Sequence, residues 1–589
     1  MNYQWNLSVL YPGIDSKEYQ DDFQFLDELI QNLEEKADAL FVSENPSIAL
    51  SDFLKEETRF MEKALRLHEY VFLKQSVDTT NAEVANAINQ LQNKLTKTTI
   101  AMTKMKKFVS LQDDLDDLIG GNTYLKEHEF LLDEIKKLSR YQLNENEEEI
   151  ISKLYLNGGN NWSNLQEYLT STLAVDYKGD QTTLPAIRNL AYSDDAETRK
   201  SAYEAEIASY DKIKDAISFS LNSIKGEVNS LCELRGYNSA IERTLVNSRM
   251  SQSTLDSLLA AIQKSLPKFQ AYLKHKSLLL GHQNGLPWYD LFAPIGEKGN
   301  RFEIEDAQKF IIKQFGTFSD DLAQMAHDAF EQEWIDFLPR SKKVGGAFCA
   351  NLSVVKQSRI LTNYDYTLSD VVTLAHELGH AYHGMHIQNH SILNTDYTMP
   401  VAETASTFCE SIVMNAVLKD ADKKEKVKLL ESTIQDFTQI IVDIYSRYLF
   451  EEEVFLLRKS AFLFSNELEE IMISAQKKAY GNGLDVNYLH PYMWINKSHY
   501  YSVGISFYNF PYAFGGLFAK GLYAKYVEEG KSFVEKYQKL LQATTVNTVE
   551  DVAAMVGIDI TQQSFWDKSL EMVEEMIDEF IEITKEDLV

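Results

Sequence analysis

Hydrophobic residues recur at steps of three and four along most of the chain, which is the period of an α-helix. Residues 17–40 and 51–75 have this pattern and predict amphipathic helices. The clearest stripe lies between residues 84 and 109, where Thr98 is the one exception: Val84, Ile88, Leu91, Leu95, Met102, Met105 and Val109. Such a narrow stripe suits helix-on-helix packing, and Gly120-Gly121 is expected to end it. The pattern in the first third of the chain therefore predicts long helical hairpins.

Two stretches depart from the helical period. Between residues 155 and 190, apolar and aromatic positions are bracketed by Gly158-Gly159 and Lys178-Gly179-Asp180, which favours a short strand or hairpin. Residues 344–350 and 358–364 predict two further short strands. Helical patterns fill the intervals and continue to the acidic C-terminal tail. The predicted fold class is mainly α, with many helices and a small β-sheet.

Composition and charge narrow the possible partners and the compartment. The chain is 44% hydrophobic and 25% charged, which is ordinary for a soluble globular protein. Its formal net charge of -30, without a strongly basic cluster, argues against nucleic acid and anionic membrane surfaces as partners. Three scattered cysteines favour a reducing compartment. With neither a basic, apolar leader nor a bilayer-length apolar run, we expect a cytoplasmic protein.

A His-Glu-Leu-Gly-His motif occupies residues 376–380 within a helical pattern. Residues four apart lie on the same face of an α-helix, so His376 and His380 can direct both imidazoles at one cation. Zinc accepts such nitrogens at about 2.0–2.1 Å. Glu377 is expected beside the ion, where its carboxylate can take a proton from zinc-bound water. The expected cofactor is one zinc ion per chain.

The residues before this motif predict how the helix begins and what lies next to it. Thr367-Leu368-Ser369-Asp370 can form a capping box at the start of the helix. Further upstream, Gly345, Gly346 and Ala347 belong to the first of the two predicted strands. The glycines permit close backbone approach, and a strand edge beside a metal can hold an extended peptide by main-chain hydrogen bonds. These three residues are candidates for substrate binding, with a purely structural hairpin as the alternative.

A catalytic zinc usually has three protein ligands and a water molecule, and two residues compete for the third place. His386 falls six residues after His380, as in metzincins, but on a continuous helix it would lie about 240° from the ligand face. The glycine that breaks the helix in metzincins is displaced here by one position. Glu403, on the next predicted helix, could complete a His, His, Glu set, with Glu410 on the same face anchoring a ligand. Spacing leaves this choice open.

Two motifs carry a resemblance to a known family: residues 376–380 and residues 400–406, Pro-Val-Ala-Glu-Thr-Ala-Ser. Both are similar to motifs of the oligoendopeptidase F branch of the thimet oligopeptidase family. Less specific matches extend the similarity over nearly the whole chain, at residues 5–8, 184–189, 235–240, 288–294 and 345–348. The resemblance implies that Glu403 is the third zinc ligand.

Residues 498–516 contain one histidine and several tyrosines among glycines. From composition alone they could be aromatic core under a flexible turn, or donors aimed at the oxyanion of a tetrahedral intermediate. The resemblance implies that a histidine and tyrosines of this segment bind substrate and the oxyanion. It assigns these roles to His499, Tyr508 and Tyr512. Tyr501 is the alternative substrate-binding tyrosine, because this chain has extra residues in the loop around Val503-Gly504 relative to the family.

These observations predict a zinc-dependent metalloendopeptidase that acts on short peptides, with Glu377 as general base and then general acid. The resemblance implies a mostly helical body with a deep channel that excludes folded proteins. We expect an N-terminal helical domain at residues 1–195, forming a channel wall or lid, and a catalytic domain at residues 196–589. The alternatives are a metzincin that uses His386 and a peptide-binding scaffold in which the histidine motif is incidental.

Overall fold

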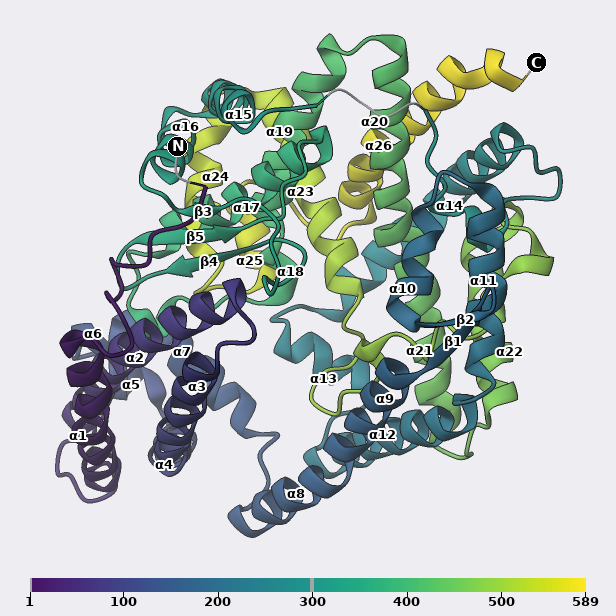
Figure 1. Ribbon diagram of the computed structural model, residues 1–589. Coiled ribbons are helices and arrows are strands. Elements are labelled where there is room, and N and C mark those ends of the chain that lie inside the picture. Colours follow the sequence, from purple (N-terminus) through teal and green to yellow (C-terminus); the bar gives the residue numbers. More distant parts are fainter. Residues whose placement is uncertain (1–2, 297–300, 589) are drawn as a thin grey trace.

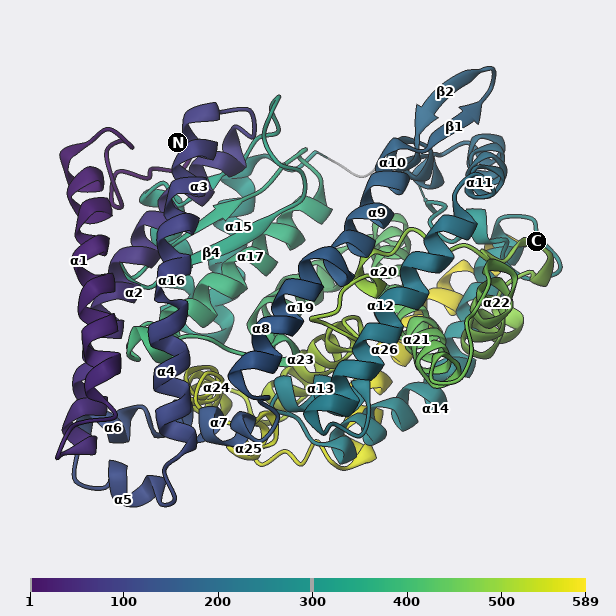
Figure 2. The ribbon, with the colours of Figure 1, turned by 90° about the horizontal axis from the view of Figure 1, so that it is seen from below.

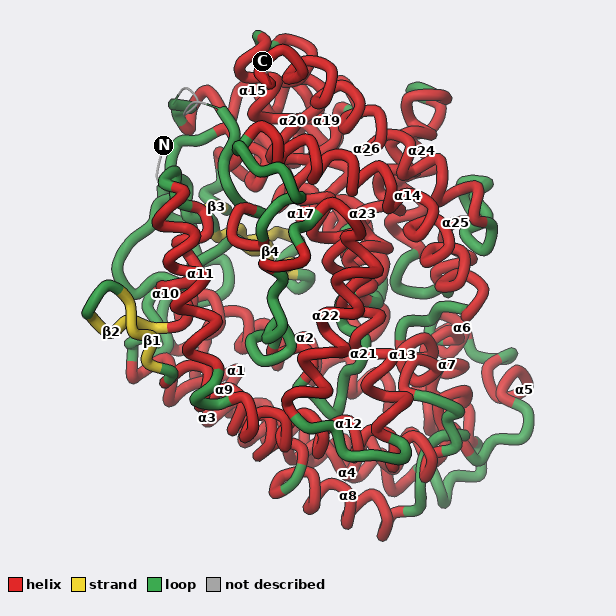
Figure 3. The backbone as a smooth tube through the Cα atoms, turned by 90° about the vertical axis from the view of Figure 1, so that its right-hand side faces the viewer, coloured by secondary structure: helices red, strands yellow, loops and turns green. Residues whose placement is uncertain are grey.

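The computed structural model describes residues 3–296 and 301–588 and shows a mainly helical protein (Figure 1). In the part of the chain that it describes, the strands form one sheet of two and one sheet of three (Figure 3). The predicted fold class is confirmed. Within the same ranges, no helix combines the length and apolar character that crossing a bilayer requires.

The N-terminal helices form a separate group below the larger sheet (Figure 1). They are α1 (Lys17–Ala39), α2 (Pro46–Val77), α3 (Ala82–Leu95), α4 (Thr99–Ser110), α5 (Leu115–Ile119), α6 (Thr123–Glu127) and α7 (Glu129–Ser139). The helices predicted at residues 17–40 and 51–75 are confirmed as α1 and α2, which pack against each other.

The stripe predicted as one helix between residues 84 and 109 is divided into α3 and α4. A 3-10 turn, Thr96–Thr98, separates them at the position where the apolar spacing fails, and the Thr98 hydroxyl donates to the carbonyl of Leu95 at 2.8 Å. The prediction that Gly120 ends this helix is wrong. Helix α4 already ends at Ser110, and the short α5 begins anew because Asp114 caps it by accepting from the amide of Asp117.

The predicted hairpin is present in the second half of residues 155–190. Strands β1 (Ala174–Tyr177) and β2 (Asp180–Thr183) pair antiparallel, and they project from the body at one edge (Figure 2). Lys178 and Gly179 join them with φ values of 52° and 92°, the left-handed geometry of a tight hairpin turn. The residues before the hairpin are helical instead, in α8 (Glu145–Asn157) and α9 (Gly159–Thr172).

Most of the remaining chain packs as helices around one large core. Before the larger sheet these are α10 (Leu184–Asn189), α11 (Ala196–Tyr210), α12 (Lys214–Arg235), α13 (Ala240–Asn247), α14 (Gln252–Leu279), α15 (Ile304–Phe318) and α16 (Asp320–Glu331). Towards the C-terminus they are α20 (Lys423–Thr438), α21 (Ile444–Arg458), α22 (Ser465–Tyr480), α23 (Phe510–Glu529), α24 (Ser532–Ala543), α25 (Val549–Ala554) and α26 (Gln563–Thr584). The predicted C-terminal helix is confirmed as α26, which packs along α14.

The larger sheet lies against the helix that carries the histidine motif, α17 (Leu368–Ile387) (Figure 1). Its strands are β3 (Ile335–Asp336), β4 (Phe348–Leu352) and β5 (Gln357–Leu361), in the order β3-β5-β4. Strand β5 pairs parallel with β3 and antiparallel with β4, which leaves β4 at the edge. The two predicted strands are present but shorter, and β3 was not predicted because two residues give no readable alternation.

This sheet belongs to two hydrophobic cores at once. One core is built from α1–α7 and the residues before them, and it includes Leu352 of β4 and Leu361 of β5. The other core begins at Leu173 and includes Ile360, the residue next to Leu361. Because successive residues of a strand face opposite sides, the two faces of the sheet serve different cores. The domain boundary at residue 195 stays a prediction, although the change of core falls earlier, between residues 135 and 173.

Candidate metal centre

Helix α17 begins where the capping box was predicted. Thr367 accepts from the amide of Asp370 at 3.2 Å, and Asp370 accepts from the amide of Thr367 at 2.8 Å. These bonds satisfy two amides that the first turn of a helix leaves unpaired. The helix then runs without a break to Ile387, so His376 and His380 lie one turn apart on the same face.

Glu403 lies at a junction between two helices. The prediction that Glu403 lies on a helix needs correction, because it lies between a four-residue helix, α18 (Met399–Ala402), and α19 (Thr404–Asp420), which follows. Glu403 has φ −89° and ψ 8° there. The hydroxyl of Ser406 donates to Glu403 Oε2 at 2.7 Å, which helps to fix the carboxylate.

His376, His380 and Glu403 bring three potential ligand atoms together. The two Nε2 atoms are 3.2 Å apart, and Glu403 Oε2 lies 3.3 Å from that of His376 and 3.4 Å from that of His380. Donors placed tetrahedrally at about 2.0–2.1 Å from zinc would be about 3.3 Å from one another. Within the described ranges, this is the group of histidine, cysteine and acidic residues close enough to hold an ion. The residues present therefore fit a zinc ion.

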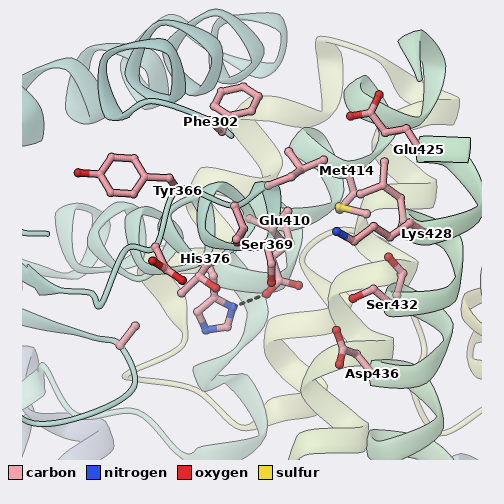
Figure 4. A pocket seen from close by; sticks show the side chains of 18 of the residues that line it. Phe302, Tyr366, Ser369, His376, Glu410, Met414, Glu425, Lys428, Ser432 and Asp436 are labelled. Carbon is pink, nitrogen blue, oxygen red and sulfur yellow. Dashed lines mark hydrogen bonds and ion pairs between the residues drawn. The ribbon is translucent and has the colours of Figure 1, made fainter. Parts of the chain in front are cut away.

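Glu410 orients one of these histidines, as the sequence suggested. Its Oε1 lies 2.7 Å from His376 Nδ1 (Figure 4). A carboxylate only accepts, so Nδ1 carries a proton and Nε2 is the ring nitrogen that faces His380 and Glu403. Burial by itself would lower the pKa of His376, but Glu403 and Glu410 outweigh it and raise that pKa to about 10. Two carboxylates around one imidazole make a strong site for positive charge.

Gly379, inside the histidine motif, permits the close approach of α17 to α19. A Cβ atom at this position would lie 2.6 Å from the carbonyl oxygen of Ala405 and 2.6 Å from the Cα atom of Ser406. Both are backbone atoms two and three residues after Glu403, so they cannot move aside without moving Glu403. The glycine therefore sets the distance between the histidine pair and Glu403.

Replacing Gly379 by alanine is expected to lower the free energy of unfolding by about 3 kcal/mol, because the added methyl forces two backbones apart. Thermal unfolding of the purified variant measures this. The matched control is Gly316→Ala in α15, where a Cβ would meet only Ala323 Cβ at an ordinary 3.7 Å. That change should raise stability slightly, by about 0.5 kcal/mol, since alanine favours a helix. Equal stabilities for the two variants would contradict this account of Gly379.

Glu377 faces a cavity of about 1030 Å³ along the N-terminal half of α17. Its side chain is 5% exposed, and burial raises its pKa above the usual value for a glutamate. Figure 4 shows His376 and Glu410 on one side of this cavity and residues of α20, among them Asp436, on the other. A buried carboxylate next to the ligand group is placed to accept and return a proton.

The predicted substrate-binding residues just before β4 differ in position: one lines the cavity and two are exposed in a loop. Ala347 lines the cavity together with His376 and Glu377. Gly345 and Gly346 are exposed in the loop before the strand, where Asn363 donates to the carbonyl of Gly346 at 2.8 Å. Strand β4 follows directly and is an edge strand, so its outer main-chain groups are available to an extended chain.

His499, Tyr508 and Tyr512 lie in contact with one another. The His499 ring stacks on Tyr508 with centroids 4.4 Å apart, and the Tyr512 hydroxyl donates to that of Tyr508 at 3.2 Å. Gly515, one turn after Tyr512 on α23, comes so close to Glu403 that a Cβ there would lie 3.0 Å from Glu403 Cβ. Burial first, then Tyr508 and Glu403, raise the pKa of Tyr512. The row therefore approaches the ligand group through Tyr512.

Tyr501 is placed differently from the other predicted tyrosines. Its side chain is 1% exposed, and its hydroxyl donates to the carbonyl of Trp494 at 2.8 Å. This position corrects the prediction that Tyr501 contacts substrate, because the hydroxyl is bound inside the core. The segment turns through a 3-10 helix, Ser498–Tyr500, which directs neighbouring side chains to different sides.

His386 does not join the ligand group. It lies on the unbroken α17, where its Nε2 is 3.9 Å from Asp321 Oδ2, and its ring meets Tyr382 edge to face. Burial lowers its pKa. The metzincin arrangement would need the helix to end before His386, and it does not.

Two residues that support the site were not assigned a role from the sequence. Ser406 holds Glu403, and a hydroxyl three residues after a carboxylate near a helix start could have indicated this contact. Asn351 of β4 donates to the carbonyl of His380 at 3.2 Å and packs against Gly384. That contact joins residues far apart in the chain, so spacing along the sequence carries no signal for it.

Comparisons with known proteins give consistent findings. The family model described as "Peptidase family M3" matches residues 189–572, and that described as "Oligopeptidase F" matches residues 111–174. "Oligopeptidase PepF" of Bacillus subtilis is 25% identical over 98% of this chain and 87% of its own length. "Group B oligopeptidase PepB" of Streptococcus agalactiae is 23% identical over 98% and 96%. The solved oligoendopeptidase-F from Enterococcus faecium superimposes with a TM-score of 0.72 at 19% identity, covering 97% of this chain and 99% of that one.

Proposed function

The chain belongs to peptidase family M3, whose members are metallopeptidases that cleave peptide bonds, and from this premise we propose that it is a zinc-dependent endopeptidase of short peptides. The observation that carries the proposal is the triangle formed by His376, His380 and Glu403, with sides of 3.2 to 3.4 Å. Its dimensions match those of a tetrahedral zinc site with three protein ligands and one open position.

In this proposal His376, His380 and Glu403 hold one zinc ion. When bound, zinc supplies a Lewis acid that acidifies a water molecule and polarises the carbonyl of the bond to be cleaved. The Glu377 carboxylate, buried beside the ligand group, takes the proton of the attacking water and passes it to the leaving amine. Glu410 keeps the Nδ1 proton of His376 in place and so maintains the tautomer that leaves Nε2 available.

The remaining predicted residues act on the substrate. The row of His499, Tyr508 and Tyr512 offers N–H and O–H donors near Glu403, where they can stabilise the negative oxygen of the tetrahedral intermediate. The free edge of β4 binds the peptide main chain, with Ala347 beside the reacting bond. The cavity of about 1030 Å³ admits a peptide segment but not a folded domain, which supports short peptides as substrates.

Three free cysteines agree with a reducing environment, and we place the protein in the cytoplasm. The N-terminal helices are proposed as a wall or lid of the substrate channel. The rival of a non-catalytic peptide-binding scaffold predicts that the protein contains no stoichiometric zinc.

Removal and return of the metal tests the proposed function. Chelation of the purified protein is expected to abolish cleavage of a quenched fluorescent peptide, and one equivalent of zinc should restore it. Circular dichroism before and after chelation is the control, because the ligand triangle is held by packed helices and the fold should persist. Full cleavage by protein that elemental analysis shows to be free of metal would contradict the proposal.

A further inference from the structure

A second cavity adjoins the first at Asp436 of α20. It has a volume of about 670 Å³ and is lined by residues of α9, α10, α11, α20 and the segment 490–497. Asp436 lines both cavities and stands at the lower end of the row of α20 residues in Figure 4. The two cavities therefore meet at Asp436.

This second cavity contains an unpaired positive charge, at Lys497. Neighbouring cations have partners: Arg188 lies 3.2 Å from Glu206, and Arg447 is paired with Asp443. The side-chain ammonium of Lys497 has no hydrogen bond or ion pair with any residue in the ranges that the structure describes.

The surroundings of Lys497 disfavour its charge when nothing is bound. Burial lowers its pKa to about 7, and the positive charge of Arg447 adds to that effect. Arg188 acts in the same direction, while Asp443 and Glu206 partly oppose it. An ammonium in such a place gains most from an anionic ligand that supplies the missing partner.

A peptide bound along the edge of β4 is expected to have its C-terminal end towards this cavity. Strand β4 lies beside α17: Ala347, just before the strand, lines the first cavity with His376, and Asn351 near its far end contacts His380 and Gly384. A peptide pairing antiparallel with the free edge of β4, the more stable arrangement per residue, runs the opposite way. Its C-terminal part therefore passes His376 into the first cavity and continues towards Asp436 and the second.

We propose that Lys497, together with Arg188, forms a subsite that binds a carboxylate of the peptide substrate on the C-terminal side of the cleaved bond. The carboxylate is that of the peptide C-terminus or of an acidic side chain near it. This inference rests on the proposed function, because it requires a peptide bound along β4. It makes Lys497 a specificity-determining residue that contacts substrate away from the reacting atoms.

Three quenched fluorescent peptides of one sequence test the subsite: one with a free C-terminal carboxylate, one with a C-terminal amide, and one amide with glutamate as its last residue. In Lys497→Gln, KM for the peptide that supplies the carboxylate should rise by about ten- to hundredfold, the value of a charge-assisted hydrogen bond, with kcat nearly unchanged. KM for the plain amide should not change.

Two further variants are controls. Lys497→Arg should preserve the preference for the peptide that carries the carboxylate. Lys477→Gln, which removes an exposed lysine of α22 outside both cavities, should leave all three KM values unchanged.

Each outcome decides the matter. A loss confined to the free-acid peptide supports the subsite and assigns it to the C-terminus, and a loss confined to the glutamate peptide supports it with a side-chain carboxylate. An equal change for all three peptides, or none, overturns it. The same three peptides with a reduced, uncleavable central bond separate this result from the proposed function. Fluorescence anisotropy measures their binding without requiring cleavage. A carboxylate preference in binding without metal-dependent cleavage would refute the proposed function and leave the subsite standing.

Discussion

Replacing Glu377 by glutamine is expected to lower kcat by about 10²–10⁴-fold, the contribution of a positioned general acid–base group. Glutamine has nearly the same shape but cannot accept a proton. Glu377 is 5% exposed and is not one of the three ligand residues, so the variant should fold and bind zinc as before. Peptide cleavage and zinc content measured on the same preparation check both parts of this prediction.

A carboxylate elsewhere in the same cavity provides the control. Glu425 of α20 lines the cavity but lies away from the ligand group (Figure 4), and Glu425→Gln should keep kcat within about twofold, since it removes charge without removing a base. Turnover by Glu377→Gln close to that of the unmodified enzyme would assign the proton transfer to another group.

Replacing Glu403 by alanine is expected to weaken zinc binding by more than about 100-fold, because even residues that only support a ligand are worth about 10–100-fold. The loss should also remove peptide cleavage, since two imidazoles remain where three ligands are needed. Zinc affinity measured by competition with a chelator of known strength gives the first quantity.

His386→Ala is the matched comparison, because a metzincin site would reverse the two results. His386 lies near Asp321 and away from Glu403, so its removal should leave zinc affinity within about threefold of the original, as expected for a residue outside the ligand set. Loss of zinc from His386→Ala together with retention by Glu403→Ala would overturn the ligand assignment.

Site residues were predicted best from the sequence where their spacing follows the regular period of a helix. His376 and His380 lie on one face because they are four apart, and the capping box formed because its two residues are three apart. Glu403 needed the family resemblance, because it lies in a junction whose backbone no periodicity describes. Spacing suggested that Glu410 anchors one of the proposed ligands, and in the structure its carboxylate lies 2.7 Å from His376 Nδ1.

Irregular segments and contacts between distant residues were beyond such reasoning. Tyr501 and Tyr508 are both tyrosines of one loop, yet one is bound in the core and the other stacks on His499. Their directions depend on turns and on packing, not on residue type. The tight contact at Gly379 likewise depends on how α17 meets α19, and the motif alone does not reveal that its fourth residue sets a helix separation.

The sheet that serves two cores has an evolutionary consequence. Leu352 and Leu361 pack among the N-terminal helices, while the neighbouring Ile360 packs with the helices around the ligand group. A substitution in the N-terminal bundle is therefore felt by the strand next to the histidines, although it lies hundreds of residues away in the chain. The bundle cannot be exchanged between homologues as a free module. A chimaera should inherit the bundle together with its matching strands, so recombination is expected to be tolerated outside this unit and selected against within it.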